Sequence, residues 1–414
     1  MKLRITTIIT ILFFSNFVMA QWVQRAAFPG VSRAKAASFT IGNKIYVIGG
    51  ISNSVVVLRD FWEYDITTNS WSQKANFPGE ERYGAATFVL NGRGYIATGG
   101  NDFGFLDDLW EFNPLTDTWA QRNGLPAGSA QHENQRREAF AFTIGNKAYL
   151  GGGDGFVFGA NQTWNYAFFD LWEYNTNTNN WIPKSSIPDA IGRNMSIGVT
   201  VNNKGYVGMG CNVDQNINRT SFWEYEPVAD NWTAKSDFPN NFTTDASTFV
   251  LDTTLYLIGG VNLNPVALSN QFYKYEPFSD TWTQLPDFSG GAIAGAICGT
   301  NGITAFVGTG YNASVVTRSD LWEIASIQTG IDGNQIAIDN KAILYPNPMR
   351  DRVSIQSEEE IGSVKFYDVS GKLVLMEEGN FENINVQNLN PGIYHLSLKY
   401  KNGIVVNKQI VKLN

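Results

Sequence analysis

The stretch Lys44-Ile45-Tyr46-Val47-Ile48-Gly49-Gly50 is an apolar segment that ends in a pair of glycines, and it recurs along the chain. Further copies follow at intervals of about 50 residues, at 94–100, 149–153, 206–210, 256–260 and 306–310. Behind each copy comes an aromatic segment of the kind Asp60-Phe61-Trp62-Glu63-Tyr64. This spacing is typical of a four-stranded propeller blade, so the chain is predicted to be all-β and to form a six-bladed β-propeller.

The sixth unit lacks a segment that the other units have. Units one to five carry a further tryptophan after the aromatic segment, whereas none follows Trp322-Glu323-Ile324. The missing piece is found near the other end of the chain, where Trp22-Val23-Gln24-Arg25-Ala26-Ala27-Phe28-Pro29 matches residues 71–78. We therefore expect the N-terminal strand to complete the sixth blade, which closes the ring and leaves no free sheet edge.

These repeats resemble the kelch family, in which a glycine pair after an apolar strand is followed by an aromatic residue and then a tryptophan. The resemblance covers about residues 22–324, and it implies a kelch-type propeller spanning 21–324. The glycine pair is incomplete at Met209-Gly210 and Thr309-Gly310, and Tyr273 replaces the tryptophan in unit five. None of these departures changes the expected fold.

Charge and composition exclude several classes of protein. Lys and Arg number 30 against 38 Asp and Glu, and the net charge of −8 argues against a nucleic-acid-binding protein, which would carry a basic face. Cys211 and Cys298 fall two blades apart, so no disulfide is expected. Two cysteines and one histidine in the main domain cannot supply four zinc ligands, and no metal or cofactor is predicted.

The first residues have the pattern of a secretory signal. Lys2 and Arg4 precede an apolar run, 5–18, and a small residue stands at the cleavage point, Ala20. We predict that 1–20 is a signal peptide removed after Ala20. The run is shorter than the ~20 residues that a membrane helix needs, and no later stretch is long and apolar enough to cross a bilayer.

The C-terminal part differs in composition from the repeats and is predicted to be a second domain. Residues 325–342 look like a linker, and 343–414 alternate as expected for a small antiparallel β-sandwich. The motifs Tyr345-Pro346-Asn347-Pro348, Asp368-Val369-Ser370-Gly371-Lys372 and Pro391-Gly392-Ile393-Tyr394 resemble the C-terminal sorting domain of the type IX secretion system of Bacteroidetes. The resemblance implies export through the periplasm to the outer-membrane surface or the medium, with the secretion machinery as a partner. An ordinary adhesion-type sandwich is the alternative.

Four arginines occupy one register of the repeat, six residues before equivalent first-strand positions: Arg33, Arg82, Arg136 and Arg193. If their guanidinium groups converge on the channel mouth, they would bind a carboxylate or sulfate through bidentate hydrogen bonds. The alternative is that each arginine pairs with an acidic residue of its own or the next blade, because surface ion pairs are common and mostly structural.

The third unit is enlarged by two insertions. Residues 124–138 contain His132, Glu133 and Glu138, and residues 156–169 contain Trp164 and Tyr166. Both insertions are expected on the same face, where aromatic rings and polar groups together would suit a carbohydrate. A self-packed surface loop is the alternative.

Two enzymatic functions are alternatives to binding. A copper oxidase of the galactose type is disfavoured, because the propeller has one histidine where that chemistry needs two. An acidic-sugar epimerase resembling sialic-acid epimerases would use Glu133 or Glu138 beside Arg136 as acid and base. The preferred hypothesis is a secreted or cell-surface module that binds a glycan or an acidic protein ligand at the propeller mouth, and the third is a protein-interaction scaffold.

Overall fold

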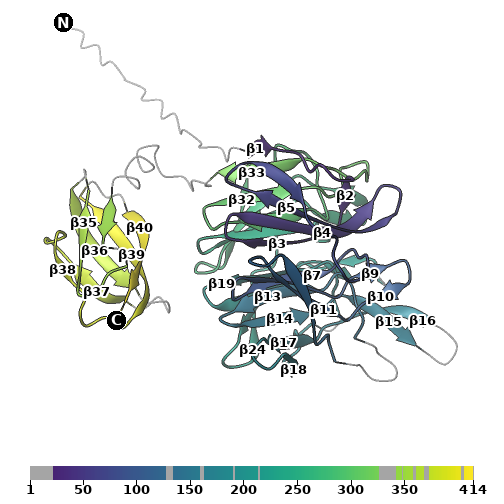
Figure 1. The fold of residues 1–414 in the computed structure, drawn as a ribbon, viewed down its shortest axis with the longest axis horizontal. Helices are drawn as coiled ribbons and strands as arrows, with labels where there is room; N and C mark the ends of the chain where they lie inside the picture. Colours follow the sequence, from purple (N-terminus) through teal and green to yellow (C-terminus); the bar gives the residue numbers. More distant parts are fainter. Residues whose placement is uncertain are drawn as a thin grey trace, which may run out of the picture. The chain divides into compact units, whose positions relative to one another are not determined.

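The computed structural model describes residues 22–126, 134–158, 163–189, 192–212, 215–325, 342–346, 348–357, 360–367, 373–401 and 405–413. Within these residues every regular element is a β-strand, which confirms the predicted all-β class (Figure 1). The chain divides into two compact units, one of residues 20–327 and one that contains residues 328–414.

Among the described residues, the larger unit contains six antiparallel sheets of four or five strands, one for each repeat, which we call blades 1 to 6. Each blade has four main strands in the spatial order first, second, third, fourth. Blades 1 to 3 are made of β3 (Ala37–Ile41), β4 (Lys44–Ser52), β5 (Val57–Asp65) and β6 (Ser70–Gln73); β7 (Ala86–Leu90), β8 (Arg93–Ala97), β11 (Leu109–Asn113) and β12 (Thr118–Arg122); and β13 (Phe140–Ile144), β14 (Lys147–Gly151), β17 (Leu171–Asn175) and β18 (Asn180–Lys184).

Blades 4 and 5 follow the same plan. They are made of β19 (Ile197–Val201), β20 (Lys204–Gly208), β23 (Phe222–Glu226) and β24 (Asn231–Lys235); and β25 (Ser247–Leu251), β26 (Thr254–Ile258), β29 (Phe272–Glu276) and β30 (Thr281–Leu285). A short strand, β2 (Arg33–Ala34), pairs with the far end of β4 in blade 1.

Blade 6 combines the two ends of the repeat region. It contains β31 (Ile297–Thr300), β32 (Thr304–Gly308) and β33 (Leu321–Ala325), and its fourth strand is β1 (Trp22–Arg25). β1 runs antiparallel to β33 with Trp22 opposite Ile324, which is the pairing that the sequence match predicts. The first strands contact one another in the order β3, β7, β13, β19, β25 and β31, and β31 also contacts β3.

Aromatic side chains fill the space between neighbouring blades. Along β5, Phe61 packs into one cluster with Phe112 of blade 2, whereas Tyr64 packs into another with Phe306 of blade 6. Neither cluster could be buried by a single sheet, because each face of a blade needs the next blade to cover it.

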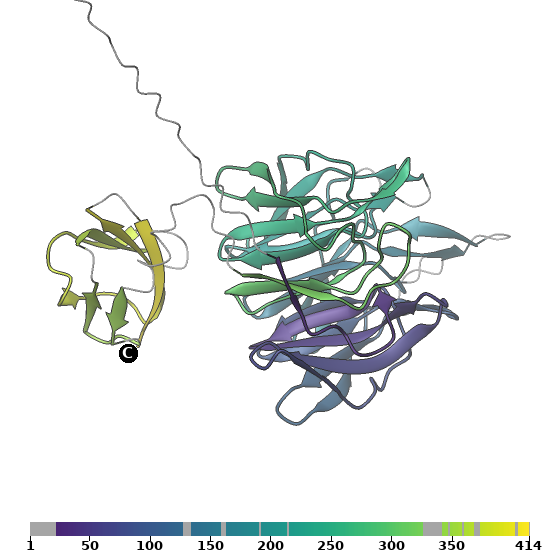
Figure 2. The same ribbon diagram turned by 90° about the horizontal axis from the view of Figure 1, so that it is seen from above.

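Hairpins extend from the ends of the second and third strands and project to the same side of the propeller (Figures 1 and 2). They are β9–β10 (Gly100–Asn101, Gly104–Phe105), β15–β16 (Asp154–Phe158, Thr163–Ala167), β21–β22 (Cys211–Asn212, Ile217–Asn218) and β27–β28 (Val261–Leu263, Val266–Leu268). In blade 1 the long strands β4 and β5 make the corresponding hairpin. We call this side the hairpin face.

The smaller unit has two sheets. One contains β34 (Ile343–Tyr345), β35 (Arg352–Gln356) and β38 (Ile384–Asn385), and the other contains β36 (Ile361–Tyr367), β37 (Leu373–Glu377), β39 (Gly392–Tyr400) and β40 (Val405–Lys412). Their apolar sides form one core around Val364, Phe366 and Leu396. The predicted turn at 368–372 lies outside the described residues.

Candidate functional site at the channel mouth

The four arginines of the repeat register do not face the channel. In blade 1, the guanidinium of Arg33 is fully buried and donates to both carboxylate oxygens of Asp60, at 2.5 and 2.7 Å. It also donates to the carbonyl of Gly49 at 2.9 Å and lies 4.5 Å from the ring of Phe28. The indole of Trp62 donates to the same carboxylate, so Arg33 and Asp60 form a structural pair inside their own blade.

The same pairing recurs in the next blades. Arg82 donates to Asp108 at 2.6 and 2.8 Å, and Arg136 donates to Asp170 at 2.6 and 2.9 Å. Arg193 is buried and contacts Ser221 and Asp189. These contacts match the alternative given above, in which each arginine pairs with an acidic residue, and they argue against an acidic-ligand role, because a buried guanidinium already bound to a carboxylate has no free edge for a ligand.

The repeats contain a signal that predicts these pairs. An aspartate stands two residues before the third-strand tryptophan in blades 1, 2, 3 and 6: Asp60, Asp108, Asp170 and Asp320. In blade 6, where Ile293 replaces the arginine, Arg318 from the hairpin takes the carboxylate of Asp320. Blade 4 keeps Arg193 but has Ser221 at the aspartate position, and there Asp189 supplies the carboxylate.

The residue two positions after the register position of each blade, which is an arginine in blades 1 to 4, Thr243 in blade 5 and Ile293 in blade 6, lies at the centre of the propeller. We call these six residues, one from each blade, the axial ring: Lys35, Gly84, Glu138, Met195, Asp245 and Gly295. The backbone N–H of each one donates to the carbonyl of the preceding one, at 2.7 to 3.3 Å, and the bond from Lys35 to Gly295 returns to the start. All six have left-handed backbone angles, with φ between 51° and 60°.

Glycines at the end of the second strands let the ring segments approach the blades. Gly153 has φ of +88°, and a Cβ built on it would lie 2.5 Å from the carbonyl oxygen of Arg137, the residue just before ring member Glu138. A side chain cannot be accommodated at that distance. The recurring glycine pair therefore positions the ring as well as ending the strand.

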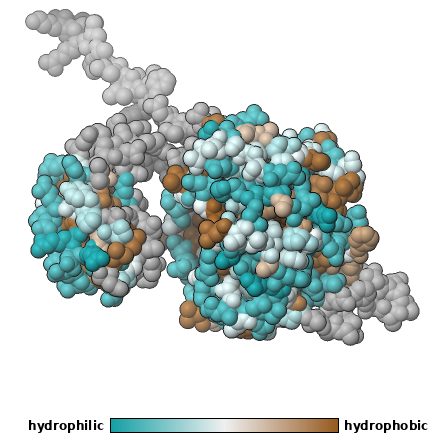
Figure 3. Space-filling view, viewed as in Figure 1, coloured by the Kyte–Doolittle hydropathy of each residue, from teal (hydrophilic) through white to brown (hydrophobic). Residues whose placement is uncertain are grey.

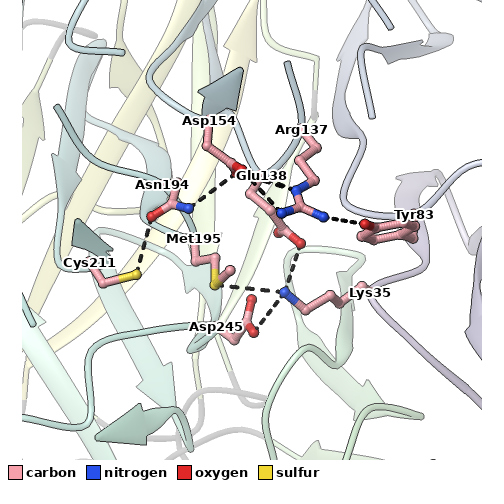
Figure 4. Close-up of polar contacts among 9 residues, drawn as sticks. All are labelled: Lys35, Tyr83, Arg137, Glu138, Asp154, Asn194, Met195, Cys211 and Asp245. Atoms are coloured by element: carbon pink, nitrogen blue, oxygen red, sulfur yellow. Dashed lines mark hydrogen bonds and ion pairs between the residues drawn. The ribbon is translucent and has the colours of Figure 1, made fainter. Parts of the chain in front are cut away.

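Three ring side chains from alternate blades meet on the axis (Figure 4). The ammonium of Lys35 lies 2.7 Å from Oε1 of Glu138 and 2.9 Å from Oδ2 of Asp245, and its third contact is the thioether of Met195 at 3.7 Å. Burial by itself would lower the pKa of Lys35. The attraction of the carboxylates of Asp245 and Glu138 is stronger than this effect, so the pKa of Lys35 is raised. The lysine is held as an ammonium ion and is not available as a base or nucleophile.

A second polar network lies beside this triad, on the hairpin side. The residue before each ring member pairs with the start of a hairpin, as Arg137 does with Asp154 and Asn194 with Cys211. Arg137 contacts the hydroxyl of Tyr83 and the buried carboxylate of Asp154, and Asn194 donates to Asp154 at 3.1 Å (Figure 4). Burial raises the pKa of Asp154 against the attraction of Arg137.

The axial ring lines a pocket of about 150 Å³, together with small residues that follow the ring members, such as Ala36, Ala85 and Ala139. Within the described residues, no group of three His, Cys, Asp or Glu side chains is arranged to hold a metal ion. The thiols of Cys211 and Cys298 are unpaired, as the sequence predicts.

The other predicted site residues lie in the enlarged third unit. His132 and Glu133 fall outside the described residues, and for Trp164 the structure gives its place in β16 but no side-chain contacts. Tyr166 packs edge-on against Phe168, with ring centroids 5.3 Å apart. Glu138, a candidate acid or base, is instead bound to Lys35.

The segments that carry the two insertions of this unit contact each other at their bases. Arg137 of the first forms a bridge with Asp154, which opens the β15–β16 hairpin. Phe156 stacks on Phe105 of blade 2 at 4.4 Å, and Phe105 lies 4.8 Å from the guanidinium of Arg137. The base of the hairpin is thus held by packing, while β15 and β16 project from the propeller (Figures 1 and 2).

Exposed valines that the sequence pattern does not predict gather on the hairpin of blade 1, on the loop between β32 and β33 of blade 6, and just before β2. We call them the valine patch: Val31, Val55, Val56, Val315 and Val316, each between 43% and 69% exposed. Hydrogen bonds join their segments, since Thr317 N donates to Asn53 Oδ1 at 2.7 Å and the Thr317 hydroxyl bonds that of Ser32 at 2.8 Å. In Figure 3, apolar side chains lie along the edge of the propeller where the hairpins project.

Two of these valines occupy equivalent strained positions. Val55 has φ of 60° and Val315 has φ of 57°, in loops closed by the same hydrogen bonds, Val55 N to Ser52 O and Val315 N to Asn312 O. A β-branched residue is rarely found at positive φ, where glycine or asparagine is favoured. The signal in the sequence is the repeated Ser-Val-Val at 54–56 and 314–316.

Comparison with known families agrees with this geometry. Residues 9–153 match the family model of the KLHDC2/KLHL20/DRC7 Kelch-repeats domain, and residues 343–412 match that of the secretion system C-terminal sorting domain. The chain carries kelch repeats and a type IX sorting tail. Comparison with curated proteins finds no match.

The kelch repeats and the sorting tail together indicate an exported binding or protein-interaction module. The sorting tail indicates export to the cell surface or secretion, and it implies the secretion machinery as a partner. In the part of the chain that the structure describes, no helix has the length and apolar character required to span a membrane. The predicted signal peptide lies outside the described residues and stays a prediction.

Proposed function

We propose that the kelch propeller is an exported module that binds a protein partner through the valine patch on its hairpin face. The observation that carries this proposal is the strained pair Val55 and Val315. Each costs roughly 1–2 kcal/mol relative to a residue suited to positive φ, and strain of this kind is kept where it serves a function.

The chemistry of the patch favours a protein over a sugar. Branched aliphatic side chains bury well against another apolar surface, whereas a sugar ring needs aromatic faces and polar groups for its hydroxyls. An acidic ligand is not part of this proposal, because the register arginines are bound to carboxylates.

Photocrosslinking on the full-length protein tests the proposal. A photoreactive amino acid in place of Val56 or Val316 is expected to crosslink one discrete protein at the surface of the producing cell. The same probe at Val228, exposed in the turn between β23 and β24 at the opposite ends of the strands, is the control. The double variant Val55→Asn, Val315→Asn should abolish the crosslink formed by the probe at position 316. The proposal would be refuted if the crosslinked protein still appeared in the double variant, or if the probe at position 228 gave the same crosslink.

Glycan binding is the second candidate, and it is favoured by aromatic residues on blades 2 and 3. Phe103 is 88% exposed at the tip of β9–β10, close in sequence to the Phe105–Phe156 stack, and Tyr166 lies in the neighbouring hairpin. A glycan array separates the two candidates, since Phe103→Ser should weaken glycan binding while the valine variants leave it unchanged.

A further inference from the structure

The axial ring brings an unequal number of charges together in one buried place. Among the described residues at this end of the channel, two cations, Lys35 and Arg137, face three carboxylates, Glu138, Asp154 and Asp245. The other titratable groups around them are the hydroxyls of Tyr83 and Tyr311 and the thiol of Cys211, all neutral when protonated. One negative charge is therefore left without a partner of its own.

The surplus charge is centred on the two carboxylates that share Lys35. Each accepts one bond from the ammonium, at 2.7 Å for Glu138 and 2.9 Å for Asp245, so the two acids are brought close to each other by the same cation. The negative charge of Glu138 at the same site disfavours the ionised form of Asp245, so a proton on Asp245 removes the surplus charge.

We propose that Lys35, Glu138 and Asp245 form a proton-linked latch on the propeller axis, in which uptake of one proton by Asp245 balances the charge and tightens the joint between blades 1, 3 and 5. The joint belongs to the fold itself, because the same residues carry the closed circle of backbone hydrogen bonds. A proton bound at this triad therefore affects the contact between three blades, because Lys35, Glu138 and Asp245 come from blades 1, 3 and 5.

The direction of the effect is opposite to that of an ordinary surface carboxylate. Burial raises the pKa of Asp245, Lys35 lowers it and Glu138 raises it further, with a net increase. The folded chain then binds a proton more readily than the unfolded chain, so stability increases as the pH falls from neutral through the native pKa of Asp245. At lower pH the gain ends, because carboxylates with depressed pKa values, such as Glu111 and Asp320, begin to lose their partners.

Thermal unfolding of the full-length protein, followed by tryptophan fluorescence, tests the latch. All 12 tryptophans lie between residues 22 and 322, so the signal reports on the propeller. Asp245→Asn keeps the shape and mimics the protonated acid. Its unfolding temperature at neutral pH is expected to exceed that of the parent protein by a few degrees, and its rise on mild acidification should be smaller than that of the parent.

Two further variants complete the test. Lys35→Met removes the shared cation, so it should lower the unfolding temperature at neutral pH and recover much of the loss in mild acid. Asp117→Asn, which changes an exposed partner of Lys74, is the control and should follow the parent profile. If Asp245→Asn is less stable than the parent at neutral pH and keeps the parent's pH profile, the latch is an ordinary ion pair and the inference fails.

Discussion

The ammonium of Lys35 lies 2.9 Å from the carboxylate of Asp245, although the two residues come from blades 1 and 5 and meet only across the propeller axis. Glu138 of blade 3 completes the contact at 2.7 Å. Because these residues sit at the same position of three repeats, one short contact depends on the placement of all the blades between them.

The register arginines are expected to be structural. Arg82→Met leaves the carboxylate of Asp108 in a partly buried place without its cation, which should lower the free energy of unfolding by about 3 kcal/mol. Urea unfolding followed by tryptophan fluorescence measures the change. Asp117→Asn removes an exposed ion pair and should cost less than about 1 kcal/mol. Equal effects of the two substitutions would contradict the structural role.

Gly153 is expected to tolerate no side chain. Gly153→Ala adds a Cβ about 2.5 Å from the carbonyl oxygen of Arg137 at positive φ, so it combines a clash with backbone strain. Gly92→Ala has positive φ but open space around it, and it should cost about 1 kcal/mol from strain alone. The same urea experiment compares them, and a cost at Gly153 no greater than at Gly92 would show that the ring segment can move away.

The N-terminal strand is expected to hold blade 6 together. Trp22 is buried, and its ring contacts Phe288 at 4.7 Å and Phe272 of blade 5 at 5.4 Å. Trp22→Ala should lower the free energy of unfolding by about 3–5 kcal/mol. Phe278→Ala, at a fully exposed turn, should change it by less than about 0.5 kcal/mol, and a small effect at Trp22 would argue against the strand's role.

The strained valines are expected to cost stability. Val55→Asn and Val315→Asn place a residue that accepts left-handed angles at φ of 60° and 57°, so each should raise the free energy of unfolding by roughly 1–2 kcal/mol. Val56→Asn, at a neighbouring exposed site without positive φ, is the matched control. A clear loss of stability in the first two variants would mean that the valines are retained for packing.

Cys211 is expected to be unreactive in the folded protein. Burial raises the pKa of its thiol to about 12, so at pH 8 nearly all of it is protonated and no thiolate is present to attack a reagent. In a Cys298→Ser variant, Ellman's reagent should label less than a few per cent of the protein until urea is added. Labelling should follow unfolding, and rapid reaction without denaturant would show that the thiol is accessible.

Several features could be predicted from local pattern. The period of the glycine pairs and tryptophans predicts the blades, and the match of 22–29 to 71–78 predicts the partner of β1, since Trp22 is found opposite Ile324. The motifs at Tyr345 and Pro391 predicted the sorting tail, which its family model matches. In each case neighbouring residues carry the information, because a strand's alternation and a turn's glycine act over a few positions.

The direction of side chains that meet distant partners was decided by the tertiary structure. The repeat spacing shows that Arg33 and Arg82 occupy equivalent positions in their blades. Their burial against Asp60 and Asp108, however, depends on how the third strand of each blade lies beside the loop that precedes the first strand. The axial triad and the valine patch exist only because separate repeats are brought around one axis. Local sequence dictates which face of a strand is apolar, whereas the contacts between blades follow from closing the circle, which no single repeat encodes.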